Sequence, residues 1–520
     1  MSDTTITFLV LGAVVVVFVW DRFPVAIVAV GTALALWATG VLDLDQALAG
    51  FGDQTVIFIA SLFVVSEGLE AAGVTSWAGQ ELVARVGESR TRLVVLTMLL
   101  VAVVTALISV NGSVAALAPV AVVTAVRLGR SPSQLLMPVA FGAHAGSLLL
   151  LTGTPVNVIV SQAAADAGVG RFGFFEFGLV GVPLVAGTIA IVVLFGERLL
   201  PHRSGRTVSR DFGDHARTLV EQYELGDGAT ALLTRRSGVA EVVVPPRSAL
   251  VGELAYPGMV TESGDLVVLA VQRKGEDLAG ECALAVGDTL LLQGSWGALD
   301  RHLDDPDVLV VDDPELVRRQ AVPLGAGSKR ALAVLAGMVI LLATGAVPPA
   351  AAGLLAAGAM VLLGVLGMEQ AFRGISWTTV VLVAGMISLS TAMTETGAAG
   401  KLADGLVDIV GDAGPHALLL GLFVLTAVLG QLISNMATAL IVIPIAISAA
   451  GDMDVSAKPV LMTVAVSAAA AFLTPVATPA NLMVMGPGGY RFGDYWKLGL
   501  PLLVLYGVVA VGLVPVFWRF

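Results

Sequence analysis

Hydrophobic positions along the chain form long uninterrupted blocks in two groups. These blocks fall near residues 5–21, 23–42, 54–73, 92–109, 113–127, 134–166 and 174–200, and again near 330–345, 348–366, 377–397, 415–433, 437–450, 457–488 and 496–517. A hydrocarbon layer of roughly 30 Å requires about 20 consecutive apolar residues in a helix. The pattern therefore predicts an α-helical polytopic membrane protein.

Residues 201–328 separate the two groups and have a different pattern. The block starts with the charge-rich stretch "RTVSRDFGDHARTLVEQYELGD" and continues with short apolar segments, "AEVVVP", "DLVVLAVQR" and "DTLLLQG", separated by turn residues. Such segments are typical of β-strands. The sequence thus predicts a first membrane repeat over 1–200, a small soluble α+β domain over 201–328, and a second membrane repeat over 329–520.

The two membrane halves repeat each other at a constant spacing. The segment "VLDLDQALAG" from Val41 matches "VLGMEQAFRG" from Val365, and the residue numbers differ by 365 − 41 = 324. The same offset relates three further pairs, namely Gly73 with Gly397, Asn111 with Asn435, and Asn157 with Asn481. Repeats of whole helical units are a known design of transporters, which place their substrate site at the repeat interface.

The number of spans in each half predicts how the halves are oriented. Each half contains five full spans and one pair of short segments, 92–109 with 113–127 and 415–433 with 437–450. If these pairs are re-entrant hairpins, each half crosses the membrane an odd number of times and the second repeat is inverted. Most basic residues then fall on one side, which is the cytoplasmic side by the positive-inside rule. We expect residues 201–328 in the cytoplasm and a multi-pass chain in the cell (inner or plasma) membrane, in contact with lipid.

Polar residues interrupt the apolar segments at two kinds of place in each half. The hairpin interruptions are "LISVNGSVAALAP", with Ser109, Asn111, Gly112 and Ser113, and "LISNMATALIVIP", with Ser434, Asn435 and Thr438. The later interruptions are "LTGTPVN", with Thr152, Gly153, Thr154 and Asn157, and "LTPVATPAN", with Thr474, Thr478 and Asn481. Irregular backbone at membrane depth is tolerated only where it faces protein or a polar cavity. It creates helix N-termini that attract anions and free oxygens that suit Na⁺.

A purely structural role is the alternative for each polar residue taken alone. A Ser-Asn pair in a membrane helix is more often a cap, a kink or an interhelical hydrogen bond than a ligand. Four interruptions that are pairwise equivalent under the repeat favour binding, and we expect Asn435 to cap the helix that follows it. His144 has no ionisable counterpart, because Ala468 stands at the repeat offset. For His144, packing or an interhelical hydrogen bond is favoured over proton coupling.

Composition narrows the function classes. The chain is 57% hydrophobic and 13% charged, and its net charge of −12 argues against nucleic acid as a partner. The single cysteine, Cys282, excludes an internal disulfide framework. No paired carboxylates, histidine cluster or nucleophile–base pair occurs at membrane depth, which argues against an enzyme. No lysine or arginine stands near the interruptions in the sequence, so bound Na⁺ and helix N-termini would balance an anionic substrate.

At the interruptions the chain resembles the divalent anion/sodium symporter family, over roughly 1–200 and 329–520. The resemblance implies a homodimer that works by an elevator mechanism. It implies substrate contacts at Asn111, Gly112, Ser113, Ser434, Asn435 and Thr438, and Na⁺ contacts at Ser109, Asn111, Thr152, Gly153, Thr154, Asn157, Asn435, Thr474, Thr478 and Asn481. Two departures stand out, since Val110 separates Ser109 from Asn111 and Met436 stands where the family usually has threonine.

The middle block resembles the C-terminal regulatory domain of potassium-transport RCK proteins over about 236–304. The segments that carry this are "AEVVVPPRSALVGELAYPG" and "LAVGDTLLLQGSWGALDRHL". Such domains usually dimerise, and some bind small nucleotide effectors, so the resemblance implies a regulatory insertion.

Taken together, the sequence predicts a Na⁺-coupled symporter of a small divalent anion, with no organic cofactor. Sulfate or a related oxyanion is favoured, with a dicarboxylate second. An arsenite-type or other exporter driven by H⁺ is the alternative within transport. A gated ion channel is a further alternative, although the chain lacks a filter sequence like "TVGYG".

Overall fold

The computed structural model describes residues 1–20, 22–74, 77–78, 81, 89–203, 237–261, 263–274, 276–278, 280–303, 307–311, 327–410 and 413–520. The charge-rich stretch at 206–227 lies outside these described residues. The chain forms two compact units, a helical unit of residues 1–69, 78–209 and 329–520, and a second unit of residues 70–77 and 210–328.

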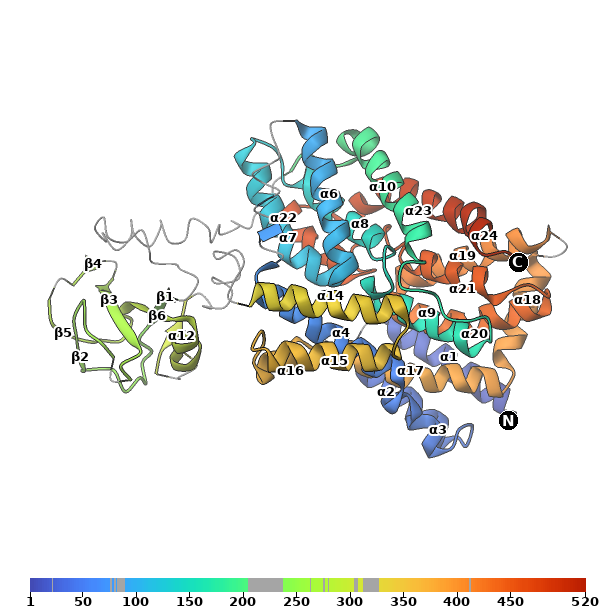
Figure 1. The fold of residues 1–520 in the computed structure, drawn as a ribbon, viewed down its shortest axis with the longest axis horizontal. Helices are drawn as coiled ribbons and strands as arrows, with labels where there is room; N and C mark the ends of the chain where they lie inside the picture. The colour runs from blue at the N-terminus through green and yellow to red at the C-terminus, as the bar shows by residue number, and fades with distance from the viewer. Residues whose placement is uncertain are drawn as a thin grey trace. The chain divides into compact units, whose positions relative to one another are not determined.

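The helical unit contains two series of helices in the same order (Figure 1). The first series is α1 (Asp3–Trp20), α2 (Val25–Ala38), α3 (Leu44–Leu48), η1 (Ala49–Gly52), α4 (Gln54–Ala71), α6 (Arg90–Leu107), α7 (Val110–Arg127), α8 (Ser133–Gly146), η2 (Leu151–Gly153), α9 (Pro155–Asp166) and α10 (Gly178–Leu199). The second is α14 (Ser328–Thr344), α15 (Pro349–Leu362), α16 (Met368–Gly374), α17 (Trp377–Glu395), α18 (Ala398–Val410), α19 (Pro415–Leu432), α20 (Asn435–Asp452), α21 (Ala457–Ala468), α22 (Pro479–Gly488), η5 (Phe492–Asp494), α23 (Tyr495–Val508), η6 (Val509–Leu513) and α24 (Val514–Phe517).

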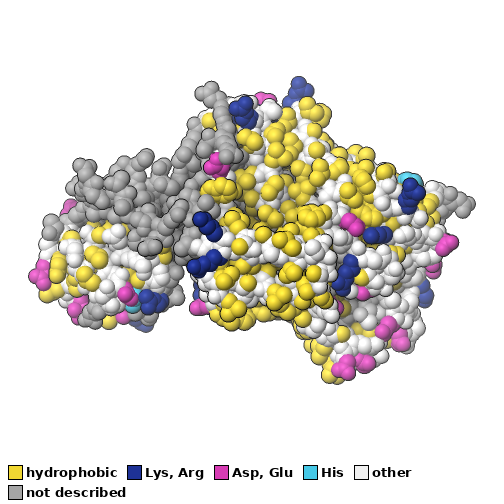
Figure 2. Space-filling view, in the orientation of Figure 1, with side chains coloured by type: hydrophobic (Ala, Val, Ile, Leu, Met, Phe, Trp, Pro, Cys, Tyr) yellow, Lys and Arg dark blue, Asp and Glu magenta, His cyan; other side chains and the backbone are white. Residues whose placement is uncertain are grey.

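These helices have the length and surface of a membrane protein. Within the described residues, eight helical segments are long and apolar enough to cross a bilayer, and α2, α7, α15 and α21 are shorter apolar helices. Large apolar side chains face outward, among them Leu194, Leu355 and Val508. On the face shown in Figure 2, hydrophobic side chains cover much of the helical unit, and charged side chains are far fewer there. The predicted fold class is confirmed, including a small sheet region that lies between the two halves in the sequence.

The repeat is visible at the level of single hydrogen bonds. The backbone N–H of Asp43 donates to Gln46 Oε1 over 3.0 Å at the start of α3. The backbone N–H of Gly367 donates to Gln370 Oε1, also over 3.0 Å, at the start of α16. The two caps are related by the offset that relates the two halves of the sequence, so the spacing read from the sequence corresponds to an equivalence in three dimensions.

The two halves interlock in a reciprocal way. Helix α8 of the first half packs against α22 of the second, and α21 of the second half packs against α9 of the first. Likewise α7 packs against α22, and α20 packs against α9 (Figure 1). Such exchanged pairs are what a two-fold relation between the halves produces, and they bring the interrupted segments of both halves together.

One helix was not predicted. Helix α18 (Ala398–Val410) follows α17 directly and carries Lys401, Asp404 and Asp408. Its charged positions recur at helical spacing, so it is amphipathic and lacks the continuous apolar run on which the span predictions were based. It packs against α20, which begins at the hairpin interruption of the second half.

The second unit is built around an antiparallel sheet with strand order β4-β3-β6-β1-β7. Its strands are β1 (Ser237–Val243), β3 (Leu266–Arg273), β4 (Glu276–Asp277), β6 (Thr289–Ser295) and β7 (Leu309–Val310), while β2 (Leu254–Ala255) pairs with β5 (Cys282–Ala283). Helix α12 (Trp296–Leu303) follows β6, and Trp296 and Leu299 join the core beneath the sheet. The three strand-like segments predicted from the sequence fall on β1, β3 and β6.

An ion pair with a buried carboxylate holds the Gly-Asp turn before β6. The Asp288 carboxylate accepts two hydrogen bonds from the Arg273 guanidinium, over 2.7 and 2.8 Å, and one from the Ala285 N–H over 2.8 Å. These bonds favour the charged form, and the Arg273 bond lowers the pKa of Asp288 from its usual value. Gly287 supplies the positive φ that this turn requires.

Candidate functional site

The first hairpin consists of α6 and α7. Ser109 is the N-cap of α7, and its Oγ accepts the N–H of Gly112 over 3.1 Å. Ser113 is fully buried, and its hydroxyl bonds to the Val110 carbonyl and to Thr105 Oγ1. Asn111 is exposed. The hydrogen bonds of the buried Ser113 hydroxyl are therefore made within the hairpin itself.

The second hairpin consists of α19 and α20 and leaves oxygens unpaired. Ser434 is the N-cap of α20 and accepts the N–H of Ala437 over 3.3 Å. The expectation that Asn435 caps this helix is therefore wrong, because the serine directly before it already holds the first free N–H. Asn435 Oδ1 and Thr438 Oγ1 are buried and have no hydrogen-bond partner. Unpaired buried oxygens carry a full desolvation cost, which a ligand can remove.

In the two hairpins the helix caps are shifted by one residue relative to the asparagines. Their caps, Ser109 and Ser434, differ in residue number by one more than the offset that relates the two asparagines. Because Val110 follows the first cap, Asn111 is the second residue of its helix, whereas Asn435 is the first of its helix. The two asparagines thus lie in different directions around their helices, since successive residues differ by about 100°.

The later interruptions are true breaks between helices. We call residues 147–154, between α8 and α9, the first break, and residues 469–478, between α21 and α22, the second break. Asn157 Nδ2 donates to the carbonyls of Ser147 and Leu150 over 2.8 and 3.0 Å. Asn481 Nδ2 donates to the carbonyls at 471 and 474 over 2.8 and 3.1 Å. Each asparagine therefore pairs the same two carbonyls that its break would leave exposed.

Each break is also tied to the hairpin of its own half. Thr152 Oγ1 donates to the carbonyl of Ala106 near the end of α6, over 3.1 Å. In the second half Gln431 Nε2 donates to the carbonyl of Ala470 over 3.2 Å, and Gln431 Oε1 accepts the N–H of Leu473 over 3.0 Å. Gln431 was not among the predicted site residues, although a glutamine in an apolar helix was a signal that it has a buried partner.

The remaining predicted residues also lie at the breaks. Gly153 is buried, and a Cβ there would overlap the Ser147 carbonyl, so only glycine fits. Thr154 is the residue before α9 and makes no side-chain cap bond. Thr474 Oγ1 accepts the N–H of Ala477, and Thr478 Oγ1 accepts the N–H of Asn481. The second break is thus capped by side chains where the first is not.

The free ends of the two asparagines differ. Asn157 is fully buried, and its Oδ1 has no hydrogen-bond partner. Asn481 is equally buried, but its Oδ1 lies 3.2 Å from His144 Nε2, which also lies 3.2 Å from Thr478 Oγ1. The expected interhelical hydrogen bond of His144 is confirmed, and its partner is one of the predicted Na⁺ ligands.

The predicted residues lie on two pairs of packed helices, and each pair joins one helix of the first half to one helix of the second half. Helix α9, which carries Asn157, packs against α20, which carries Asn435 and Thr438. Three unpaired oxygens therefore lie on one packed pair of helices. The other pair, α7 with α22, carries Ser113 and Asn481, whose oxygens are paired.

The chemistry of the unpaired oxygens suits a particular kind of ion. They are neutral amide and hydroxyl groups, which bind a hard cation without competing strongly for transition metals. In the part of the chain that the structure describes, no group of three or more His, Cys, Asp and Glu side chains could hold a metal ion.

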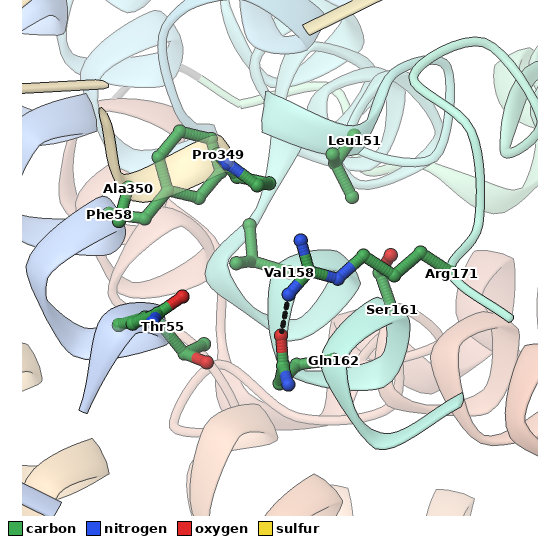
Figure 3. Close-up of a pocket in the computed structure, with 10 residues that line it drawn as sticks. Thr55, Phe58, Leu151, Val158, Ser161, Gln162, Arg171, Pro349 and Ala350 are labelled. Carbon is green, nitrogen blue, oxygen red and sulfur yellow. Dashed lines mark hydrogen bonds between the residues drawn. The ribbon is translucent and has the colours of Figure 1, made fainter. Parts of the chain in front are cut away.

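A basic residue, Arg171, lies beside the first break, although no lysine or arginine stands near the interruptions in the sequence. Figure 3 shows Arg171, from the loop after α9, in a pocket that Leu151 of the first break also lines. Its guanidinium donates to Gln162 Oε1 over 2.9 Å. Thr55 of α4 and Pro349 of α15 line the same pocket. Loop geometry brings Arg171 back over α9, which the linear sequence could not reveal.

Comparison with known proteins places these features in a wider group. The family model described as CitMHS, citrate transporter, matches residues 15–456 and 339–520. The uncharacterized transporter YfbS of Escherichia coli (strain K12) is 31% identical over 98% of this chain and 98% of its own length. Sodium/sulfate cotransporter 2 of Chlamydomonas reinhardtii is 26% identical over 56% of this chain and 34% of its own length.

One solved structure supports the fold over almost the whole chain. The crystal structure of the Alcanivorax borkumensis YdaH transporter superimposes with a TM-score of 0.52 and covers 97% of this chain and 99% of that one. The sequence identity is 15%, so this likeness concerns the fold alone.

Proposed function

Because the chain belongs to the citrate transporter (CitMHS) family, we propose that it is a Na⁺-coupled symporter of a small divalent anion. Sulfate or a related oxyanion is the favoured substrate, with a dicarboxylate second. The observation that carries this proposal is the set of three unpaired buried oxygens, Asn157 Oδ1, Asn435 Oδ1 and Thr438 Oγ1, on two packed helices.

Na⁺ is the ion that these oxygens fit best. Each is the negative end of a neutral dipole, and each would lose its desolvation cost on coordinating a cation. Asn157 is held rigidly by the two bonds of its Nδ2, so its Oδ1 is fixed in direction. A fixed oxygen costs little further entropy when an ion binds.

The anion fits at the starts of the hairpin helices. Helices α7 and α20 both begin next to a serine cap inside an apolar segment, where the N-terminal N–H groups and the helix dipole favour negative charge. Asn111, Gly112 and Ser113 would contact the anion from the first hairpin, and Ser434, Asn435 and Thr438 from the second. Bound Na⁺ at Asn435 would supply a compensating positive charge.

Two further observations bear on the choice of anion. Arg171 lines a pocket with Leu151, so an incoming anion would meet a positive side chain beside the first break. A relative over part of the chain is named a sodium/sulfate cotransporter, which supports sulfate and Na⁺ together. The elevator mechanism, the homodimer and a nucleotide effector for residues 201–328 belong to this proposal by resemblance, and the cytoplasmic location of those residues belongs to it by the distribution of basic residues.

Uptake into liposomes tests the proposal. We expect purified protein to accumulate radiolabelled sulfate when NaCl is outside and choline chloride inside, and to lose most of that uptake when choline replaces Na⁺. A melting-temperature screen with sulfate, phosphate, arsenite, succinate and citrate, each with and without Na⁺, identifies the anion, because a ligand of the folded state raises its stability. Uptake or export that follows a pH gradient and ignores Na⁺ would refute the symporter and favour the H⁺-driven exporter.

A further inference from the structure

We propose that His144 takes the place of a second cation, so that the chain binds a single Na⁺, at the first break. This rests on the proposed Na⁺ coupling and specifies its stoichiometry. It also removes Thr474, Thr478 and Asn481 from the Na⁺ ligands that the sequence suggested, and it makes His144 a residue that determines ion number.

The orientation of Asn481 follows from its hydrogen bonds. Its amide nitrogen faces the carbonyls at 471 and 474, which can only accept. Its Oδ1 therefore points the other way, toward His144 Nε2 at 3.2 Å. Because an amide oxygen cannot donate, the imidazole nitrogen must carry the hydrogen of this bond.

The imidazole N–H stands between the oxygens that a cation would need. His144 Nε2 is 3.2 Å from Asn481 Oδ1 and 3.2 Å from Thr478 Oγ1. A Na⁺ that contacted both oxygens would approach the positive edge of this N–H. The ring cannot easily turn aside, because it is buried and Phe472 packs edge-on against it with the ring centroids 5.7 Å apart. The second break is closed to a cation by a donor that already satisfies its oxygens.

The repeat supplies a natural control for this reading. His144 lies on α8 and bonds to Asn481 on α22, and Ala468, at the same repeat position, lies on α21, which packs against α9, the helix that carries Asn157. A methyl group stands where the other half has an imidazole, and Asn157 Oδ1 has no partner. The two asparagines make the same backbone bonds, and His144 is the partner that occupies the oxygen of Asn481.

The matched pair of asparagines gives the first test. The melting temperature of purified full-length protein is measured in rising NaCl, with choline chloride keeping ionic strength constant, for the wild type, Asn157→Ala and Asn481→Ala. Both variants lose the same two backbone bonds, so both should melt lower in choline. We expect Asn157→Ala to raise the apparent Kd for Na⁺ by roughly 10-fold or more, and Asn481→Ala to change it by less than about 3-fold.

Binding of ²²Na⁺ gives the second test. We expect the wild type to bind a single Na⁺ per chain at saturation, and His144→Ala, which makes the second break resemble the first, to bind more. Two ions bound to the wild type, equal weakening in both asparagine variants, or an unchanged stoichiometry in His144→Ala would each overturn the role of His144. A wild type that NaCl stabilises no more than choline chloride would instead refute the Na⁺ coupling itself.

Discussion

The first and second repeats use the same backbone solution and different side-chain chemistry. In both breaks an asparagine amide pairs the carbonyls that the interrupted helix exposes, with nearly identical distances. The oxygen of the same amide is free in the first repeat and bound to His144 in the second. The scaffold requirement holds both halves to one pattern, because unpaired backbone groups are costly at membrane depth. The side-chain oxygens that face a ligand are not held to one pattern in this way, and the two halves differ at these oxygens.

The hairpins extend this comparison and give the largest expected effect. Asn435 Oδ1 is buried without a partner, whereas Asn111 is exposed and displaced by one position around its helix. We expect Asn435→Ala to lower Na⁺-driven uptake by roughly 10- to 100-fold, because a bond to a charged ligand is worth about 1.5–3 kcal/mol. Asn111→Ala should lower uptake less, chiefly through a higher KM for the anion. Initial rates in liposomes measure both, and a larger loss in Asn111→Ala would reverse the proposed division between the hairpins.

The breaks should also differ in their tolerance of a methyl group. Gly153 of the first break corresponds to Ala477 of the second under the offset of the repeat. A Cβ at Gly153 would overlap the Ser147 carbonyl, which accepts a bond from Asn157. We expect Gly153→Ala to lower the free energy of unfolding by about 1–3 kcal/mol and to weaken Na⁺ binding.

Two variants serve as controls for Gly153→Ala. Gly12→Ala adds a methyl group inside α1 where no atom lies within 4 Å, and it should raise the free energy of unfolding by about 0.5–1 kcal/mol without changing Na⁺ affinity. Ala477→Gly should cost about 1 kcal/mol or less through backbone entropy. Thermal unfolding with and without Na⁺ checks all three, and a Gly153→Ala protein that binds Na⁺ normally would show that the geometry of the first break is not critical.

Arg171 offers a smaller effect that is specific to the first repeat. Its guanidinium lines a pocket with Leu151, and we expect Arg171→Gln to raise the KM for the anion a few-fold by removing electrostatic attraction. Lys401→Gln is the control, because Lys401 is exposed on α18 and does not line this pocket. The difference should shrink as salt increases, since charges more than about 8 Å apart are screened at about 0.15 M. Equal KM changes in both variants would point to net charge alone.

The smallest effects are expected where the repeats are alike. Gln46 and Gln370 accept equivalent N–H groups over the same 3.0 Å. We expect Gln46→Ala and Gln370→Ala each to lower the free energy of unfolding by about 1 kcal/mol, as loss of a helix cap does, without changing Na⁺ affinity. Melting curves of the two proteins measure this, and a changed Na⁺ affinity in either would mean that the caps couple to the site.

Much of the scaffold could be predicted because its signals are local. The apolar segments gave the helices to within a few residues, and the constant offset between the halves identified Asn157 and Asn481 as equivalent before any contact was known. The first result rests on the long apolar runs that a membrane requires, and the second rests on the internal repeat. The amphipathic helix α18 was missed because its charged residues interrupt the continuous apolar run by which the other helices were recognised.

The chemistry of the site was harder to predict because its contacts are remote in sequence. His144 and Asn481 are 337 positions apart, and nothing near either residue indicates the other. Ser434 rather than Asn435 caps α20, since neighbouring polar residues compete for one N–H and geometry decides between them. Arg171 is separated from Leu151 by helix α9, so only the path of the following loop shows that they share a pocket.

The exchanged packing of α8 with α22 and of α9 with α21 sets a condition on how the protein is made. The first half is synthesised before the partners of its broken helix, which lie far downstream, near the end of the chain. The Tyr490 hydroxyl, which bonds to the Ser133 carbonyl and the Met137 N–H, completes α8 only after nearly the whole chain has been translated. We therefore expect the docking of the two inserted halves to be a late step of biogenesis, and a chain truncated before α21 to remain a target for membrane quality control.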